Sequence, residues 1–379
     1  MPNIDFTWLL TALVGIYLFH ILQFYSGLFR LTTIQADTPP LPVTIIVPAR
    51  NEALNISRCL NSLLNQNYPP QLIEIIVVDD NSTDETATIV TKLAQQHPQI
   101  ALISLKTATH PRASKKKAIE TAIAKSRHEI LVTIDADCEA PPDWLATLIS
   151  YFHSNVGLVA GPVLYRYKNN LFQKLQALEF LALVAAGAGS IGRGKPMIAN
   201  GANLAYRKTV FHAVQGFQGI DHIASGDDDL LIQKIARQTS WKIRFAATPK
   251  ATVKTAPSTS LGQFLEQRTR WASKATIYHS LSIKAFLIAT YLLYAILLFS
   301  VPLILAQLID PFWLGISFMM KLAADFLLVS KACARFNQRD LLKLFPLAEI
   351  LQIPYILLVG WQGFRGKYHW KGRKIMRSI

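Results

Sequence analysis

Aspartates gather at three points in this 379-residue chain, and the first is the pair Asp79 and Asp80. The pair closes an apolar run that begins at Ile73, and Asn81 and Ser82 follow it. Two adjacent carboxylates at the end of a strand can hydrogen-bond the base and the ribose of a nucleoside. The simpler alternative is a helix start, because Asn81 or Ser82 could cap a following helix. The pair is a candidate nucleoside site, and this interpretation depends on whether the other clusters support it.

The second cluster is Asp135-Ala136-Asp137, directly after the apolar run from Ile130 to Ile134. Carboxylates at this spacing can hold Mg²⁺ or Mn²⁺ while phosphate oxygens complete the coordination shell. Such an ion acts as a Lewis acid and neutralises a diphosphate leaving group. Aspartate pairs of this spacing are common by chance, and only the position at the end of a predicted buried strand favours a metal and donor site.

The third cluster, Gly226-Asp227-Asp228-Asp229, precedes a helical stretch. Three neighbouring acids repel one another, so one of them could keep a raised pKa that suits a general base. An acidic first turn that complements the helix dipole is the alternative, and it explains one or two acids better than three. Asp227 and Asp228 are the candidate bases.

A fourth motif, Gln267-Arg268-Thr269-Arg270-Trp271, lies on a predicted helix just before a second apolar region. Gln267 and Arg270 share one helix face, with Trp271 beside them. An arginine can bind a diphosphate bidentately, and a tryptophan can stack on a sugar or an acceptor. A belt of aromatic and basic residues next to a membrane would use the same residue types.

The elements that must position these motifs lie between Leu41 and about Lys274, where short apolar runs alternate with helical stretches. Continuous apolar strands separated by helices indicate a parallel sheet with helices on both faces. In such sheets ligands bind at the carboxyl ends of the strands. The predicted fold class is therefore α/β, with strands over Val43–Ala49, Ile73–Asp80 and Ile130–Asp137 and helices over Glu52–Leu64 and Thr83–Gln96.

Apolar segments flank this domain on both sides. Trp8 to Phe29 is a run of 22 residues, and about 20 residues span a bilayer. No positive charge precedes it, so we predict a retained anchor over residues 1–40 rather than a signal peptide. In the C-terminal region, residues 275–379, Ala285–Ile309 and Phe312–Val329 predict a helical hairpin. Leu341–Phe364, interrupted by two prolines and a glutamate, either spans or re-enters the membrane, and a basic tail follows.

The net charge of +15 fits this mixed architecture. Basic residues crowd the membrane-flanking segments, as expected for a multi-pass protein with a cytoplasmic catalytic domain. The expected partners are therefore membrane lipids and not nucleic acid, for which no recognition motif is found. Lys321 and Asp325 stand four residues apart in an apolar run, so a transporter or receptor without catalysis is the alternative outside the enzyme class.

In order and spacing these motifs resemble the family 2 glycosyltransferases, the membrane-bound inverting group that includes cellulose, chitin and hyaluronan synthases and ceramide glucosyltransferase. Lys115 lies 20 residues before the Asp135 cluster, where the family has a Gly-Lys pair. The resemblance implies a GT-A fold flanked by transmembrane helices. It covers Leu41 to Lys274 and rests on PARNE at Pro48, DDNS at Asp79, DAD at Asp135, GDD at Gly226 and QRTRW at Gln267.

The resemblance implies a role for each matched position. The family's Glu-Asp pair is replaced here by Gly-Asp-Asp-Asp, so Asp227 competes with Asp228 for the role of base. Asp228 is preferred because Leu231 then keeps the family's three-residue spacing from the base. The donor would contact Pro48, Glu52, Asp79, Asp80 and Lys115; Asp135 and Asp137 would hold donor and metal; Asn200, Gly201, Ala202, Asn203, Gln267, Arg270 and Trp271 would line the acceptor and diphosphate path.

The function implied by this resemblance is inverting, metal-dependent transfer of a sugar from a nucleotide sugar, with a UDP-sugar favoured. The acceptor would be lipid-linked or a cell-envelope glycan, and the location would be a bacterial inner membrane by analogy. Processive polysaccharide synthesis is the alternative within the enzyme class, although few C-terminal helices are available for a long secretion channel. The sequence names neither the sugar nor the acceptor.

Overall fold

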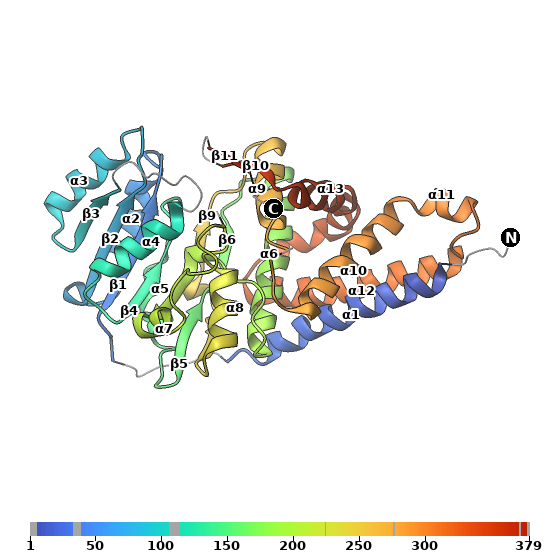
Figure 1. Cartoon of the computed structure of the whole chain (residues 1–379), viewed down its shortest axis with the longest axis horizontal. Helices are drawn as coiled ribbons and strands as arrows, with labels where there is room; N and C mark the ends of the chain where they lie inside the picture. The colour runs from blue at the N-terminus through green and yellow to red at the C-terminus, as the bar shows by residue number, and fades with distance from the viewer. Residues whose placement is uncertain are drawn as a thin grey trace.

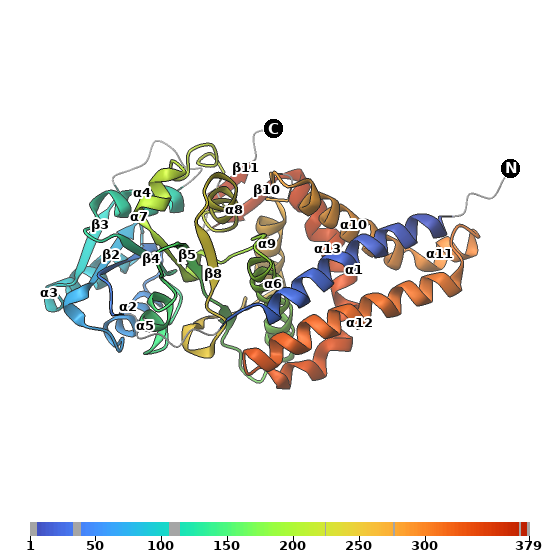
Figure 2. The same cartoon turned by 90° about the horizontal axis from the view of Figure 1, so that it is seen from below.

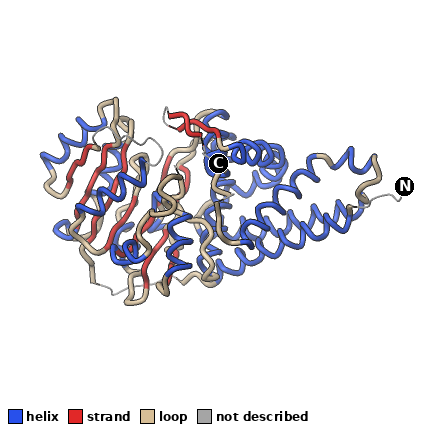
Figure 3. The backbone as a smooth tube through the Cα atoms, in the orientation of Figure 1, coloured by secondary structure: helices blue, strands red, loops and turns tan. Residues whose placement is uncertain are grey.

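The computed structural model describes residues 6–32, 39–105, 114–223, 225–275, 277–370 and 373–376. A sheet-based domain forms one end of the molecule and long helices form the other (Figure 1). Helices α6 (Leu171–Gly192) and α9 (Leu261–Ala272) stand between the two ends. Figure 3 shows the same division, with helices alone at the far end.

Seven strands form the main sheet, in the order β3-β2-β1-β4-β7-β5-β8. Neighbouring strands from β3 to β4 run parallel, as the sequence predicts, and β5 is parallel to β8. All of β2 is buried, and all of β1 except Pro48, which explains their continuous apolar sequences. The strands are β1 (Val43–Ala49), β2 (Ile73–Asp79), β3 (Ile100–Ser104), β4 (Ile130–Thr133), β5 (Val156–Ala160), β7 (Leu204–Arg207) and β8 (Lys242–Phe245).

Strand β7 departs from the predicted parallel sheet, because it runs antiparallel to both β4 and β5. Its first residue, Leu204, pairs with Thr133, the last residue of β4. The chain therefore returns from α6 at the edge where β4 ends, and a parallel strand would need a further crossover. This return places the 3₁₀ turn η2 (Gly201–Asn203) beside the carboxyl end of β4.

Helices and short strands complete the domain. The two predicted helices begin later than expected, at Ile56 and Thr86. The residues before them form turns, in which the side chains of Thr86 and Asp84 accept the backbone N–H groups of Glu52 and Ala53. Strands β6 and β9 form a separate parallel pair. The remaining elements of the domain are α2 (Ile56–Leu64), η1 (Pro70–Leu72), α3 (Thr86–Gln96), α4 (Ser114–Lys125), α5 (Trp144–Ile149), β6 (Val163–Tyr165), α7 (Lys208–Ala213), α8 (Asp229–Gln238), η3 (Pro249–Ala251) and β9 (Val253–Thr255).

Five helices in the described residues are long and apolar enough to cross a membrane. Three of them, α1 (Thr7–Phe29), α10 (Leu281–Leu298) and α12 (Pro311–Arg335), lie side by side (Figures 1 and 2). The predicted hairpin is present as α10, the short helix α11 (Ser300–Leu305) and α12. The third predicted segment forms η4 (Arg339–Leu344) and one continuous helix, α13 (Phe345–Arg365), before the hairpin β10 (Lys367–Trp370) and β11 (Arg373–Met376).

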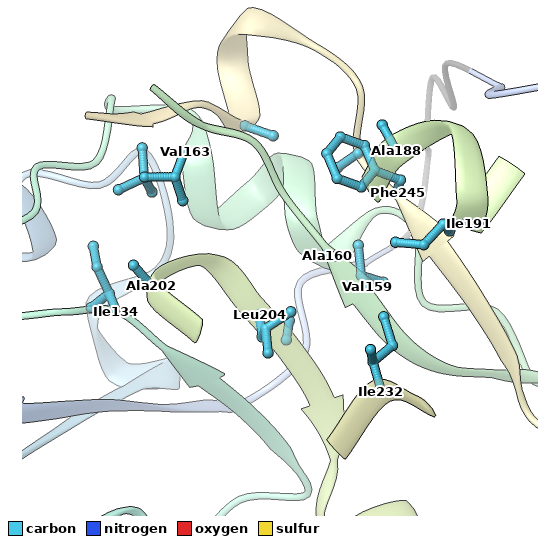
Figure 4. Packing of buried hydrophobic residues seen from close by; sticks show 14 of the residues in the cluster. Ile134, Val159, Ala160, Val163, Ala188, Ile191, Ala202, Leu204, Ile232 and Phe245 are labelled. Carbon is cyan, nitrogen blue, oxygen red and sulfur yellow. The ribbon is translucent and has the colours of Figure 1, made fainter. Parts of the chain in front are cut away.

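Helix α6 is an apolar helix that was not predicted from the sequence, and it packs between the sheet domain and helix α1. The two helices meet at glycines, where a Cβ on Gly27 would overlap the backbone of Gly189 and one on Gly192 would overlap that of Gly27. Small residues let helix backbones approach this closely. On its other side, α6 buries Ala188 and Ile191 against the sheet, close to Phe245 at the end of β8 (Figure 4).

Candidate active site

The carboxyl ends of β1 and β2 bring the PARNE and DDNS motifs together. Glu52 and Asp80 are buried and line one large cavity, with Pro48 beside them. Arg50 donates from Nη1 to the backbone oxygen of Asp80 at 2.6 Å, and the same nitrogen lies 3.6 Å from Asp80 Oδ2. Asp79 has a different place, because its carboxylate accepts the backbone N–H of Ser82 and does not line the cavity.

Strand β4 ends at Thr133, four residues earlier than the predicted end at Asp137. The DAD sequence therefore lies in the turn after the strand. Asp135 and Asp137 line the same cavity as Glu52. Cys138 Sγ donates to Asp137 Oδ1 at 3.4 Å. Burial and the two neighbouring carboxylates raise the pKa of the Cys138 thiol well above its usual value, so this sulfur remains protonated beside the aspartates.

Lys115 on α4 connects the DAD turn to the GDDD sequence. Its Nζ lies 2.8 Å from Asp135 Oδ1 and 2.8 Å from Asp227 Oδ2. Burial disfavours the ammonium, but the two carboxylates outweigh it and raise the pKa of Lys115. The lysine is therefore a fixed positive charge between two acids that are 92 positions apart in the chain.

The three aspartates after Gly226 point to three different partners. Asp227 faces Lys115, whereas Asp228 caps α8 and accepts the backbone N–H groups of Asp229 at 2.7 Å and of Gly201 at 3.2 Å. Asp229 is buried, lies 2.7 Å from Lys274 Nζ and accepts the hydroxyl of Tyr278. Gly226 has φ +85°, a left-handed conformation that favours glycine and turns the chain sharply before the aspartates.

The electrostatics of Asp228 and Asp229 differ, and Asp229 is buried whereas Asp228 is only partly buried. Burial disfavours the charged form of Asp228, but Lys274 and the amide of Asp229 outweigh it, so its pKa is lowered. Burial and the adjacent charge of Asp228 raise the pKa of Asp229 despite the contact with Lys274. Asp228 is thus a stable anion held by backbone amides, and its proton affinity is low for a base.

The loop from Asn200 to Asn203 presses on the GDDD sequence. A Cβ on Gly201 would lie 2.6 Å from Asp227 Oδ2, so any larger residue there would force the Asp227 carboxylate to move. Asn200 and Ala202 line the cavity. Asn203 is fully buried and donates to the backbone oxygens of Pro162 and Ala251, so it holds the loop in place instead of facing an acceptor.

The QRTRW motif occupies the last turns of α9, and Gln267, Arg270 and Trp271 line the cavity. Arg270 Nη1 donates to Ser225 Oγ at 3.5 Å, so its guanidinium lies close to the GDDD sequence. The motif thus lines the same cavity as the DAD turn.

Two sets of contacts in this region were not predicted from the sequence. Arg268, inside the motif, is buried and donates from Nε to Glu179 of α6 at 3.0 Å, and its Nη2 also bonds Glu179. Tyr355 of α13 donates to the same carboxylate at 2.9 Å. Glu179 is the sole acid within an apolar helix, and that isolation is the signal that could have indicated a buried cation beside it.

The second unpredicted residue is Lys116, which the sequence would place on a solvated face with Lys117. Lys116 is buried, and its Nζ donates to the backbone oxygens of Ile220, Ile223 and Ser225 at 2.5 to 2.9 Å. It therefore ties the segment before Gly226 to α4. No sequence feature distinguishes it from Lys117, which is exposed.

The cavity that collects these groups has a volume of about 1330 Å³. Its polar part lies at the carboxyl ends of the strands, where the acids, Lys115 and Arg270 face one another. It continues past Trp271 between α10 and α13, where the lining is mostly apolar. The site is thus open to a polar ligand at one end and is lined by long apolar helices at the other.

Two family models match the chain and together span residues 44–330. The model described as glycosyl transferase family 2 matches residues 44–215, and the one described as glycosyl transferase family group 2 matches residues 130–330, which is more than half of the chain. The chain belongs to glycosyltransferase family group 2. The motifs that carried the resemblance all lie within the matched residues of this glycosyltransferase.

Similar proteins agree with this membership. The chain is 28% identical over 281 residues to beta-monoglucosyldiacylglycerol synthase of Synechocystis, a match that covers 70% of the chain and 55% of that protein. It is 24% identical over 237 residues to poly-beta-1,6-N-acetyl-D-glucosamine synthase of Staphylococcus epidermidis, covering 61% and 53%. The chain thus spans little more than half the length of these two relatives.

A solved structure shows the fold. The mannosyltransferase PcManGT of Pyrobaculum calidifontis, in complex with GDP-Man and Mn²⁺, matches with a TM-score of 0.54 at 22% identity, over 91% of this chain and 99% of that one. The catalytic domain of the present glycosyltransferase therefore has the GT-A fold, and the predicted fold class is confirmed.

The donor atoms at the DAD turn fit a hard divalent cation. Asp135 and Asp137 present carboxylate oxygens to the cavity, and these are the ligands that Mg²⁺ and Mn²⁺ prefer. Among the described residues no group of three or more His, Cys, Asp or Glu could hold a metal. The protein alone would supply only part of a coordination shell, which suits an ion that is bound jointly with a diphosphate.

Proposed function

We propose that this glycosyltransferase moves a sugar from a nucleotide sugar, with a UDP-sugar favoured, to an acceptor hydroxyl by one in-line displacement that inverts the anomeric carbon. The observation that carries the proposal is the position of Lys115 between Asp135 and Asp227. It brings the donor turn and the base turn to one point of one cavity. A single displacement needs the leaving group and the base on opposite sides of the reacting carbon, so the groups that bind the donor and the base must be close together.

The nucleoside would be bound by Glu52 and Asp80, both buried at the carboxyl ends of neighbouring strands and facing the cavity. Pro48 would pack beside the base. Asp79 would act through the turn that it stabilises, because its carboxylate accepts the amide of Ser82.

Asp135 and Asp137 would hold Mg²⁺ or Mn²⁺ together with the diphosphate. When bound, this ion supplies positive charge to the departing phosphate oxygens. Lys115 adds a permanent positive charge at the same place, and Arg270 offers a guanidinium that can bind a phosphate bidentately. Gln267 and Trp271 complete the wall next to the acceptor path.

The base in this proposal is Asp227 rather than Asp228, which the sequence favoured. Asp228 caps a helix. Burial alone would raise its pKa, but Lys274 and backbone amides outweigh this effect and lower the pKa. Asp227 makes its ion pair with Lys115, lies against Gly201 and lines the cavity. It would take the proton from the acceptor hydroxyl as the oxygen attacks.

The acceptor would be a lipid or a lipid-linked glycan at a bacterial inner membrane, with the catalytic domain on the cytoplasmic side. Five apolar helices and a cavity that continues between two of them support this location. A processive polysaccharide synthase is the second candidate, favoured by the likeness to poly-beta-1,6-N-acetyl-D-glucosamine synthase. Product length on a gel separates the two.

A donor screen tests the proposal. Purified protein in vesicles of bacterial lipids is given UDP-, GDP- and dTDP-sugars with Mg²⁺ or Mn²⁺, and released nucleoside diphosphate is measured. Asp227→Asn should lower transfer by about 10²- to 10⁴-fold while nucleotide-sugar binding survives, because it removes the base and keeps the shape. Asp137→Ala should weaken metal and donor binding instead. No turnover with any donor, or full activity of Asp227→Asn, would overturn the proposal.

A further inference from the structure

The cavity does not end at the catalytic groups, and its second half is built from membrane-type helices. Ile288 and Leu292 of α10 line it together with Trp361 and Phe364 of α13. These four side chains are also accessible to solvent, by 60%, 42%, 52% and 70% respectively, so they are not closed off inside the helix bundle. Residues that line a cavity and are exposed as well mark its mouth. The cavity therefore opens sideways, between α10 and α13, toward the surface that lipid would contact.

Close packing on α13 connects this mouth to the catalytic motif. A Cβ on Gly363 would lie 2.9 Å from Ala272 Cβ, directly after the QRTRW sequence on α9. One turn earlier, a Cβ on Gly360 would lie 2.7 Å from the ring of Tyr291 on α10. The two glycines let α13 touch both neighbours, so the apolar half of the cavity is bounded by the same helix that abuts the motif.

The chemistry of the lining changes along the cavity. Asp227, Arg270 and Trp271 surround the polar end, whereas Ile288, Leu292, Val359 and similar side chains surround the other. A glycan carries hydroxyls along its whole length, and burying them beside apolar side chains without partners is unfavourable. An acyl chain gains from the same contact. The lining therefore fits a molecule with a hydroxyl at one end and a hydrocarbon chain at the other.

We propose that the apolar half of this cavity is an acyl-chain site for a lipid acceptor that enters sideways between α10 and α13. The headgroup hydroxyl reaches Asp227 past Trp271 while the chain lies against α10 and α13. The proposal rests on the proposed function, because it names the acceptor of that reaction as an acyl lipid with a free hydroxyl. The proton of this hydroxyl passes to Asp227, its oxygen bonds to the anomeric carbon, and the nucleoside diphosphate leaves.

The first experiment needs no catalysis. Wild-type protein in phosphatidylcholine vesicles is irradiated with a diacylglycerol that carries a diazirine in the middle of one acyl chain. We expect adducts on α10 and α13 at the cavity mouth, between 288–292 and 356–364, and their loss when unlabelled diacylglycerol is added. Adducts spread evenly over the outer helix surfaces, without competition, would overturn the proposal.

The second experiment uses larger side chains to narrow the opening of the cavity between α10 and α13. Ile288→Trp and Leu292→Trp should raise the KM for dioleoylglycerol about tenfold while the KM for the nucleotide sugar stays unchanged, because only the acceptor contact is lost. Leu298→Trp is the matched control, since Leu298 is exposed on the same helix and does not line the cavity. Equal effects of all three variants would contradict the proposal.

Two further acceptors test which class of molecule the apolar half of the cavity accepts. A polyprenyl phosphate and a soluble oligosaccharide are tested in the same vesicles, and turnover of the oligosaccharide that is insensitive to Leu292→Trp would overturn the acyl-chain site. If the nucleotide sugar is not turned over with any acceptor, the proposed function fails. The crosslinking result then still decides whether the cavity takes an acyl lipid.

Discussion

Lys115 Nζ lies 2.8 Å from Asp227 Oδ2, joining α4 to the turn that precedes α8. The same ammonium is equally close to Asp135, so one positive charge separates two acids that would otherwise repel each other. In the proposed reaction a nucleoside diphosphate would bring further negative charge to this point, where Lys115 is the cation between the two acids.

Replacing Lys115 by Met should therefore weaken the donor complex. The variant loses a charge-assisted contact and leaves the two acids without a cation between them, so kcat/KM for the nucleotide sugar should fall about a hundredfold, or roughly 3 kcal/mol. The measurement is steady-state release of nucleoside diphosphate, together with calorimetric binding of the donor. Lys117→Met is the control, because Lys117 is exposed on the same helix. Equal losses in the two variants would contradict this role.

Replacing Asp228 by Ala should lower stability more than catalysis. The side chain caps α8, and loss of such a cap costs about 1 kcal/mol. The thermal midpoint in detergent should drop, while kcat stays well above that of Asp227→Asn. If Asp228→Ala instead removes activity as completely as Asp227→Asn without loss of stability, Asp228 is the base and the sequence preference was right.

The stability difference between wild type and Asp228→Ala should also depend on pH. Lys274 and backbone amides outweigh burial and hold the folded-state pKa of Asp228 below its unfolded value. A depressed carboxylate pKa stabilises the fold above the unfolded pKa of about 4, and the gain is lost as the pH falls through the folded value. The difference between the two thermal midpoints should therefore be full at pH 7 and shrink below pH 4. A difference that grows with acid would contradict the assignment.

The sequence predicted the sheet edge and its motifs because both depend on local patterns. Continuous apolar runs mark β1, β2 and β4, and their polar ends must meet where parallel strands end. The choice between Asp227 and Asp228 could not be made in this way. It depends on the turn at Gly226 and on the approach of Gly201, which lies in η2 just before an antiparallel strand that the sequence did not indicate.

Buried charges were the other part that the sequence could not predict. Lys116 and Lys117 are identical residues in adjacent positions, and only the tertiary position of residues 220–225 buries the first of them. Arg268 likewise lies inside the QRTRW motif, and it is buried although its neighbours Gln267, Arg270 and Trp271 are not. Its burial depends on Glu179, 89 positions earlier, on a helix that the sequence analysis did not single out.

Replacing Lys116 by Met should affect the position of Asp227 and Asp228 rather than donor binding. The change leaves three backbone oxygens, two of them in buried hydrogen bonds, without their donor, which frees the segment before Gly226. A small displacement of a catalytic group can lower its rate about a hundredfold. We expect kcat to fall by about tenfold to a hundredfold, with KM for the nucleotide sugar within about twofold. A merely structural role would lower the thermal midpoint and leave the kcat of the folded fraction intact.

The pair Arg268 and Glu179 should behave as one buried unit. Either Arg268→Met or Glu179→Leu alone leaves an unpaired charge where α6, α9 and α13 meet, and such a change costs roughly 3 to 5 kcal/mol. The double variant replaces both by apolar groups, so it should be more stable than the sum of the single changes allows. Thermal unfolding of the four proteins in the same detergent gives the coupling. Strict additivity would mean that the ion pair contributes nothing, and that the stacking of Arg268 on Trp271, whose ring centroid lies 4.3 Å from its guanidinium carbon, holds α9 instead.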